Sequence, residues 1–246
     1  MASITGKDGY VTKQVSGVDT LVAGIREWSV DYAVDMVDVT SFAITGVTHK
    51  ESMPVLMAST GSFSGNHTDG DTGLDVGTAY NITLAAHSGR AYYGSAYITS
   101  KTPSIVVDGE ATMTYNFQFT GKVYVLGANL VVNGGFTADS DWTKGTDWTI
   151  AAGVASVDGQ GAAGDLEATV DPLSATTEYW TQFKVSAFTD GTIKFYIGTT
   201  ASAYSRGATG TYTEIITSGA DGSLLFEPSV SATMSIDDVI VREVLN

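Results

Sequence analysis

The chain has 246 residues and a formal net charge of −15, with 12 Lys and Arg against 27 Asp and Glu. It contains no cysteine, which excludes both a disulfide framework and a thiolate metal site. The basic residues form no stripe, so the charge pattern argues against tight binding to nucleic acid. The many Gly, Thr, Val and Tyr residues, with only 4 Pro, predict a mostly all-β chain of short strands and tight turns.

Neither a membrane span nor a secretory signal is evident. No run approaches the ~20 apolar residues that a transmembrane helix needs, so we expect no membrane partner. Residues 1–14 lack the apolar core of a signal peptide, and we therefore expect that the protein is not secreted.

Alternation of apolar and polar residues predicts strands throughout the first half of the chain. The clearest case places Tyr115, Phe117 and Phe119 on one face and Asn116 and Gln118 on the other. The predicted strands are residues 9–15, 25–32, 36–42, 61–66, 81–86, 91–99, 105–107 and 111–125.

Three connections between these strands carry their own signals. Asp108-Gly109 is a hairpin signal, and residues 69–78 are predicted to form one short helix. Residues 43–58 are predicted to be a long loop, and a long loop within a compact domain is usually functional. These features predict a β-sandwich of two packed sheets with one short helix.

Several motifs then follow one another in a fixed order. Residues 25–42 read IREWSVDYAVDMVDVTSF, in which Trp28 opens a strand and Asp-Val-Thr-Ser-Phe closes it. STGSFSG follows at residues 59–65, and a Val-Asp-Gly turn later leads into a strand that ends Phe-Gln-Phe-Thr-Gly. In this order and spacing, the first half resembles the tail tube (major tail) proteins of siphoviruses, the bacteriophages with long, non-contractile tails.

The resemblance implies a structural protein of the virion tail, not an enzyme, assembled in the host cytoplasm. Six copies form a ring, and rings stack by helical assembly into a tube that conducts genomic DNA during ejection without binding it specifically. Further partners are the tail tip or baseplate, tape-measure and terminator proteins. The long loop packs against the next ring, and its assembly residues are His49, Lys50, Glu51, Ser52, Met53, Pro54 and Val55.

Passage of DNA requires a channel wall without accumulated positive charge, because neutralised phosphates release counterions and bind strongly. We therefore expect the wall to be acidic or neutral, and the basic residues to lie at contacts between subunits. The residues expected to face the channel are Asp31, Asp35, Asn116 and Gln118. Those expected to be absent from it are Lys7, Lys13, Arg26 and Lys101.

A domain boundary is predicted at residues 127–128, dividing the chain into a tail tube domain, residues 1–127, and a second domain, residues 128–246. The connection is short, and we expect truncation there to cut few contacts. The second domain is also predicted to consist of strands, at residues 149–157, 164–170, 178–187, 191–198, 212–217, 223–228 and 233–244.

The second half resembles carbohydrate-binding modules of the β-jelly-roll type. It opens NLVVNGGF at residues 129–136, carries DWTKGTDWTI at residues 141–150 and ends SIDDVIVREV at residues 235–244. The resemblance implies a domain that projects outward from the tube and that either binds a cell-surface glycan weakly or is only structural. Thr137 stands where the family usually has an acidic residue.

Asp237 and Asp238 are expected to lie in the middle of a strand, so that one of them points toward the apolar side. An unpaired carboxylate is costly there, and a cation or backbone N–H donors would relieve that cost. The resemblance implies that Asp237 helps to hold a structural Ca²⁺. A hydrogen-bonded structural aspartate is the alternative, and no cofactor is required otherwise.

The tryptophans of the second half suit either of two roles. Trp142, Trp148 and Trp180 could stack against a sugar ring or fill the sandwich core, where Trp is highly buried on average. Trp148 and Trp180 are predicted to be core residues, whereas Trp142 remains the candidate for contact with a glycan.

Catalytic signatures are missing from the sequence. It holds three histidines and no cysteine, and neither a Gly-x-Ser-x-Gly elbow nor a phosphate-binding loop occurs. The only clustered carboxylates are Asp139, Asp141 and Asp147, which an enzyme acting on cell-wall glycans would need to hold across a cleft. The main alternative to a tail protein is therefore a non-catalytic carbohydrate-binding accessory protein.

Overall fold

The computed structural model describes residues 9–15, 18–22, 24–38, 52–66, 73–87, 89–107, 109–159, 164–169, 173–220 and 222–245. Every regular element in these ranges is a β-strand, which confirms the predicted all-β class. The described part of the predicted helix, residues 73–78, forms a turn in which Gly73 and Gly77 have positive φ, and residues 69–72 lie outside the described ranges. No helix in the described part of the chain is long and apolar enough to cross a membrane.

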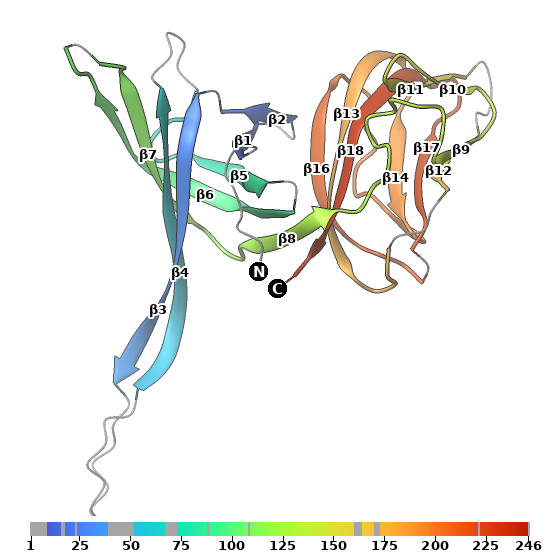
Figure 1. The fold of residues 1–246 in the computed structure, drawn as a ribbon. Helices are drawn as coiled ribbons and strands as arrows, with labels where there is room; N and C mark the ends of the chain where they lie inside the picture. Colours follow the sequence, from blue (N-terminus) through green and yellow to red (C-terminus); the bar gives the residue numbers. More distant parts are fainter. Residues whose placement is uncertain are drawn as a thin grey trace, which may run out of the picture.

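The strands fall into two halves joined by β8 (Figure 1). Those of the first half are β1 (Tyr10–Val15), β2 (Val18–Leu21), β3 (Ile25–Asp38), β4 (Ser52–Asn66), β5 (Ala79–His87), β6 (Arg90–Ser104), β7 (Thr112–Phe119) and β8 (Tyr124–Asn129). Those of the second half are β9 (Trp142–Lys144), β10 (Trp148–Ala151), β11 (Val154–Asp158), β12 (Leu166–Ala168), β13 (Glu178–Asp190), β14 (Ile193–Ile197), β15 (Thr200–Ala201), β16 (Gly210–Thr217), β17 (Leu224–Pro228) and β18 (Thr233–Val244).

Some predicted strands are longer, merged or absent. The two strands predicted within residues 25–42 are one strand, β3, as far as Asp38, and β4 begins nine residues before its predicted start. Residues 105–107 are not a strand: Ile105, Val106 and Val107 lie at an exposed hairpin end. Their β-branched side chains suit a strand locally, but no neighbouring strand pairs with them.

The first half packs the strand pair β3–β4, extended by β7 and β6, against β5, β1 and β2. Its core holds aromatic residues from β4 and β7, with Phe63 stacked on Tyr115 at 5.1 Å between ring centroids. Trp28 of β3 donates its indole N–H to the carbonyl of Ala85 at 3.2 Å and packs edge-on against Tyr92. These contacts fix the apolar face of β3 on β5 and β6.

Packing requires the two glycines of the Gly-Ser-Phe-Ser-Gly motif in β4. A Cβ at Gly61 would lie 2.2 Å from the Ser29 carbonyl oxygen and 2.4 Å from the ring of Phe117. A Cβ at Gly65 would lie 1.9 Å from the carbonyl oxygen of Gly24. Glycine at both positions lets the neighbouring backbone and the Phe117 ring approach β4 closely, as strand glycines often do.

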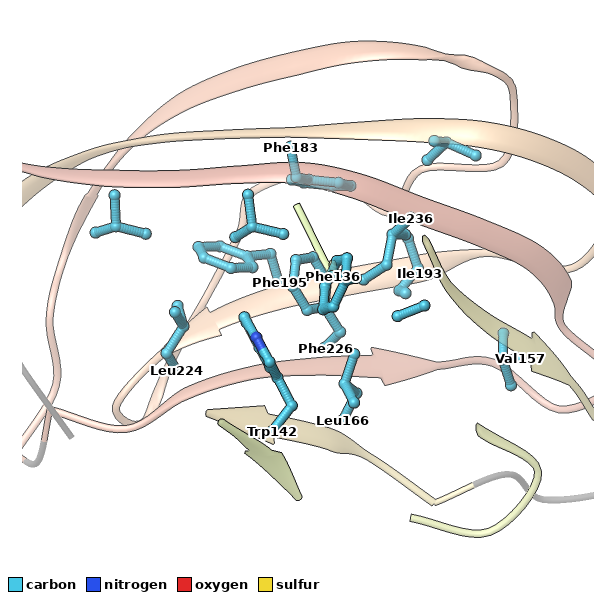
Figure 2. Packing of buried hydrophobic residues seen from close by; sticks show 14 of the residues in the cluster. Phe136, Trp142, Val157, Leu166, Phe183, Ile193, Phe195, Leu224, Phe226 and Ile236 are labelled. Carbon is cyan, nitrogen blue, oxygen red and sulfur yellow. The ribbon is translucent and has the colours of Figure 1, made fainter. Parts of the chain in front are cut away.

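The second half is a sandwich of two sheets. Strands β10, β11, β18, β13 and β16 form one, and β15, β14, β17, β12 and β9 form the other. Figure 2 shows the core between them, where Phe183, Phe195 and Phe226 meet. The ring centroids of Phe195 and Phe226 are 4.8 Å apart. This sandwich agrees with the all-β class expected from the sequence.

The two halves share a third cluster of buried side chains. Strand β8 pairs with β6 on one side and with β18 on the other, so the predicted boundary lies inside a strand. Tyr93 and Leu126 pack with Trp180, which is completely buried. The expectation that a cut after residue 127 severs few contacts is therefore wrong, because it removes β18 and Trp180 from this cluster.

Candidate functional site

One face of the sheet formed by β3, β4, β7 and β6 is polar across its whole width. Strand register aligns its side chains in three rows, because residues directly opposite one another in paired strands share a face. We call this surface the polar face. Its rows are Glu27, Ser64, Thr114 and Thr102; Ser29, Ser62, Asn116 and Ser100; and Asp31, Thr60, Gln118 and Tyr97.

The opposite face of the same four strands is apolar and buried. Phe63, Tyr115 and Phe117 alternate with the polar residues and are at most 2% exposed. The period of two in β4 and β7 thus divides the sheet into a packed side and a hydrated side.

Hydrogen bonds within the polar face occupy many of its donors. The Ser64 hydroxyl donates to the Glu27 carboxylate at 2.6 Å. The side-chain amide of Asn116 donates to the Ser100 hydroxyl at 2.7 Å, and the hydroxyls of Ser29 and Ser62 are 3.1 Å apart. These side chains bind one another across the strands, which leaves fewer donors free to grip a passing anion.

The charges of the polar face are two carboxylates, those of Glu27 and Asp31, and none of its rows holds a basic residue. Lys13 is buried with its ammonium group 5.7 Å from the Tyr80 ring, and Arg26 pairs with Glu110. The basic group of Lys101 lies over the Tyr115 ring on the other side of the sheet, 5.8 Å from its centroid. Lys7 lies outside the described residues.

The four-stranded sheet has a free edge on each side in the described part of the chain. Strand β3 pairs only with β4, so one backbone edge of a 14-residue strand has no partner. On the far side, β6 pairs with β5 only as far as Tyr97, and after a bulge at Thr99 its residues 100–104 pair with β7 alone. Free edges of this length present rows of unpaired N–H and C=O groups.

Beyond the sheet, β3 and β4 continue as a two-stranded arm, which we define as residues 34–38 paired with residues 52–57. The pairing of β4 with β7 begins only at Thr60, and Figure 1 shows the arm extending away from both halves. Two-stranded ribbons have little stability by themselves. The arm therefore lacks the support that the rest of the sheet has.

The predicted assembly residues fall partly in this arm. Ser52, Met53 and Pro54 pair with β3, and the register skips Val55 at a bulge. The prediction of a loop over residues 43–58 is therefore wrong for residues 52–58, which continue the strand. His49, Lys50 and Glu51 lie outside the described residues.

Three of the four predicted channel residues lie together on the polar face. Asp31, Asn116 and Gln118 occupy two adjacent rows, and all three are exposed. Asp35 lies farther along β3, in the arm, opposite Leu56. Sequence reasoning missed the remaining members, although the alternation of Ser62 and Ser64 with Phe63 was a visible signal.

Trp142 is not placed for contact with a glycan. It is 5% exposed, packs against Phe136 and Phe226 as Figure 2 shows, and donates its indole N–H to the Asn133 carbonyl at 3.2 Å. Trp148 and Trp180 are also buried, at 5% and 0% exposure. All three are core residues, so the prediction that Trp142 contacts a glycan is wrong.

A β-bulge changes the expected geometry of Asp237 and Asp238. Asp238 has φ 51°, and β18 contributes an extra residue opposite β13 at this point. Ile236 and Val239 consequently both face the core, at 0% and 1% exposure, and neither carboxylate points into it. The expectation that one aspartate faces the apolar side is wrong because the bulge adds a residue between the two core positions.

Asp237 and the opening turn, the groups that the resemblance implies for a calcium site, each have hydrogen bonds of their own. One carboxylate oxygen accepts the Asp238 N–H at 2.7 Å, and the Asn133 amide donates to the carbonyls of Ala138 and Ser140 at 2.8 Å each. Among the described residues no group of three or more His, Asp or Glu is arranged to hold a metal. Asp237 is half-buried, and this burial raises the pKa of its carboxyl group above the usual value.

The clustered carboxylates of the second half have structural partners. Asp139 accepts hydrogen bonds from Lys144 at 2.6 and 2.7 Å, and Asp141 accepts one from the Ser140 hydroxyl at 2.6 Å. Asp141 and Asp147 sit at turn positions with φ near 66° and 67°. These contacts and backbone conformations support turns of the chain.

No family model matches the chain, and no curated protein does. Among solved structures it is similar to the tail of an empty gene transfer agent particle refined with C6 symmetry, at 20% identity over 49% of this chain and 97% of that one, with a TM-score of 0.41. It is also similar to the SPP1 tail tube, at 19% identity over 51% and 80% with a TM-score of 0.40. The SPP1 Dit protein is 14% identical over 96% and 98%, with a TM-score of 0.34. At these scores the likeness does not establish a shared fold or function.

Proposed function

We propose that the protein is a structural component of a bacteriophage tail, in which six copies form a ring and rings stack into a tube. The observation that carries the proposal is a four-stranded sheet with one packed face, one hydrated face and a free edge on each side. A sheet of this kind is completed by further copies of itself, because ring closure removes exposed edges. The motif order of the first half supports the same assignment.

Ring closure joins the free edge of β3 in one copy to residues 100–104 of β6 in the next. Six copies of the four strands make a wall of about 24 strands; with strands about 4.8 Å apart and tilted by about 40°, its backbone diameter is roughly 45–50 Å. That leaves a channel wide enough for a DNA duplex once side chains are added. The number of copies in the ring, six, is taken from the resemblance of the first half to tail tube proteins.

The polar face lines the channel in this arrangement. Its hydroxyl and amide groups are hydrated and partly bonded to one another, and its two carboxylates repel phosphate. Genomic DNA passes such a wall without being held. The basic side chains of Lys13, Arg26 and Lys101 are engaged away from it.

The arm makes the contacts between stacked rings. Its five-residue strand end reaches about 16 Å beyond the sheet, at about 3.3 Å per residue. Packing against a neighbouring ring provides the support that an isolated ribbon lacks. Tail tip, tape-measure and terminator proteins contact the ends or interior of the tube, and the assembly takes place in the host cytoplasm.

The second half projects outward from the tube and has a structural role. The alternative, a carbohydrate-binding accessory protein, is supported by the resemblance of the second half to carbohydrate-binding modules, but Trp142, its candidate for contact with a glycan, lies in the core.

Electron microscopy of the purified full-length protein tests the assembly. Raising the protein concentration or adding a kosmotropic salt should give hollow tubes of uniform width, since both favour edge pairing and burial. Monodisperse particles of single-chain size at every concentration and salt would contradict the proposal.

A further inference from the structure

Strands of both halves form an almost continuous circuit. Hydrogen-bonded pairing runs from β2 through β1, β5, β6 and β8 to β18, and from β18 through β13 to β16. The ends of this path, β2 and β16, contact one another, yet no ladder pairing joins them in the described part of the chain. We call this junction the seam.

Side chains hold the seam where backbone hydrogen bonds do not. Val18 packs against the core of the second half, beside Gly210 at the start of β16. The carboxylate of Asp19 accepts a hydrogen bond from the Gln182 amide at 2.9 Å and another from the Thr213 hydroxyl. These residues lie more than 160 positions apart in the sequence, so the contact ties the first half to the second.

The surroundings of Asp19 are neutral at ordinary pH. Gln14 lies opposite it on β1, Gln182 and Thr213 face it from β13 and β16, and the Tyr93 hydroxyl lies near it from β6. Desolvation raises the pKa of Asp19 above its usual value, and that of Tyr93 to about 12, with the Asp19 charge as a secondary cause.

Two other charged groups nearby are directed away from Asp19 or toward another carboxylate. Lys184, one row along β13, lies opposite Asp237, and its charge only partly offsets the rise that burial causes in the pKa of that aspartate. Glu214 lies on the other face of β16 and pairs with Arg206 at 3.6 Å. The Asp19 carboxylate therefore has hydrogen bonds but no cationic partner among these neighbours.

The shared core lies directly behind the seam. Trp180 is two residues from Gln182 on the same face of β13 and packs edge-on against Tyr93, with ring centroids 6.2 Å apart. Each half also has a separate core of its own. Opening the seam consequently exposes this shared core and leaves the other two intact.

We propose that the seam between β2 and β16 is a proton-controlled latch, closed by Asp19 and opened by rotation of the halves about β8. A buried carboxylate bonded only to neutral donors is less costly when protonated. The protonated acid keeps both contacts, because the Thr213 hydroxyl serves as donor or acceptor. This inference does not depend on the proposed tail function.

The direction of the pH effect follows from the raised pKa. Closure takes up a proton, so the closed seam is most stable below the ordinary pKa of an aspartate and loses stability as pH rises through the raised value. The opening equilibrium changes by up to about tenfold per pH unit within that window and is constant above it.

Hydrogen exchange of the full-length protein, corrected for intrinsic rates, measures the opening. Amides of β2 and β16 should be less protected at pH 8 than near pH 4, whereas β4, β7, β14 and β17 serve as internal references. Asp19→Asn should retain the hydrogen bonds without the charge, and its protection should be high and independent of pH. Asp19→Ala should lower protection at both pH values, because it leaves the Gln182 and Thr213 donors without their acceptor.

A disulfide provides a second variant. Because the chain has no cysteine, Asp19→Cys combined with Thr213→Cys forms an unambiguous cross-link. Oxidation should restore high, pH-independent protection, and reduction should remove it. Equal exchange of β2 and β16 at both pH values in the unmodified protein, or equal behaviour of the Asn and Ala variants, would overturn the proposal.

Discussion

The two halves differ most in how they treat the edges of their sheets. In the first half, β3 has 14 residues and a free edge in the described part of the chain. In the second half the terminal strands are very short, with three residues in β9, four in β10 and two in β15, and β16 is covered by β2. Short or covered edges resist association, whereas a long free edge invites it.

The faces of the sheets show the same contrast. The first half exposes three rows of polar side chains and a two-stranded arm. Its hydrogen-bonding groups are therefore only partly used within the chain. The second half closes its sheets on an aromatic core, and on the back of one sheet its Trp180 is covered by Tyr93 of the first half. The first half thus leaves surfaces open for the assembly that we propose, whereas the second half covers its own.

Removing the arm should have the largest effect. Val34 lies directly opposite Met57, so residues 35–56 can be replaced by Asn-Gly, which closes a two-residue hairpin. We expect a folded protein that forms no tubes, because the contact between rings is lost. Sedimentation and electron microscopy measure assembly, and circular dichroism of the same sample confirms folding.

Two results would decide against this account of the arm. Normal tubes from the shortened protein would show that stacking does not need it. An unfolded product would show that the arm supports its own domain instead, in conflict with the absence of β7 pairing before Thr60.

Trp180→Ala tests whether the halves are one cooperative unit. The side chain is completely buried in the shared cluster, and truncation of such a residue typically costs about 3–5 kcal/mol. Denaturant unfolding should show this loss, and Trp180→Phe should lose less. A cost below about 1 kcal/mol would show that the two halves are energetically independent.

Gly61→Ala tests the packing reason for the motif in β4. A methyl group there meets the Ser29 carbonyl oxygen and the Phe117 ring, so we expect a loss of about 2–3 kcal/mol, typical of overpacking. Ser62→Ala, on the polar face next to it, is the matched control and should change stability by about 0.5 kcal/mol or less. Equal effects of the two substitutions would contradict the division of the strand into packed and hydrated faces.

Gln118→Lys should barely change stability, since the side chain is exposed. In assembled tubes it adds a ring of positive charge to the channel, and DNA retention should rise with a steep dependence on salt. Gln118→Glu is the control and should leave retention as low as in the unmodified tube. Retention that is the same for both variants would place this residue outside the channel.

Calcium should have the smallest effect. Because the Asp237 carboxylate accepts a backbone N–H and the Asn133 amide is bonded within the opening turn, we expect a chelator to change Tm by no more than about 1 °C, and Asp237→Asn to be similarly mild. A clear rise in Tm with added Ca²⁺ that is lost in Asp237→Asn would establish the structural calcium site.

Strands that carry a local signal in the sequence were predicted well. Strand β18 matches its predicted range, and the alternation in β7 placed Asn116 and Gln118 on the exposed face. Both successes depend on a period of two, which is a property of a few neighbouring residues.

Features set by distant residues were harder to predict. The burial of Trp142 depends on Phe226, and the bulge at Asp238 depends on its pairing with β13. The seam is another case, because no local pattern links Asp19 to Thr213. The free edges likewise depend on which strands are neighbours, which the sequence pattern does not specify.

A reconstruction of the assembled tube by electron cryomicroscopy tests the central claim most directly. The account predicts a closed wall made of β3, β4, β7 and β6 from each copy, with Asp31, Asn116 and Gln118 facing the channel. A channel lined by Lys13, Arg26 and Lys101, or a wall formed by the second half, would contradict it.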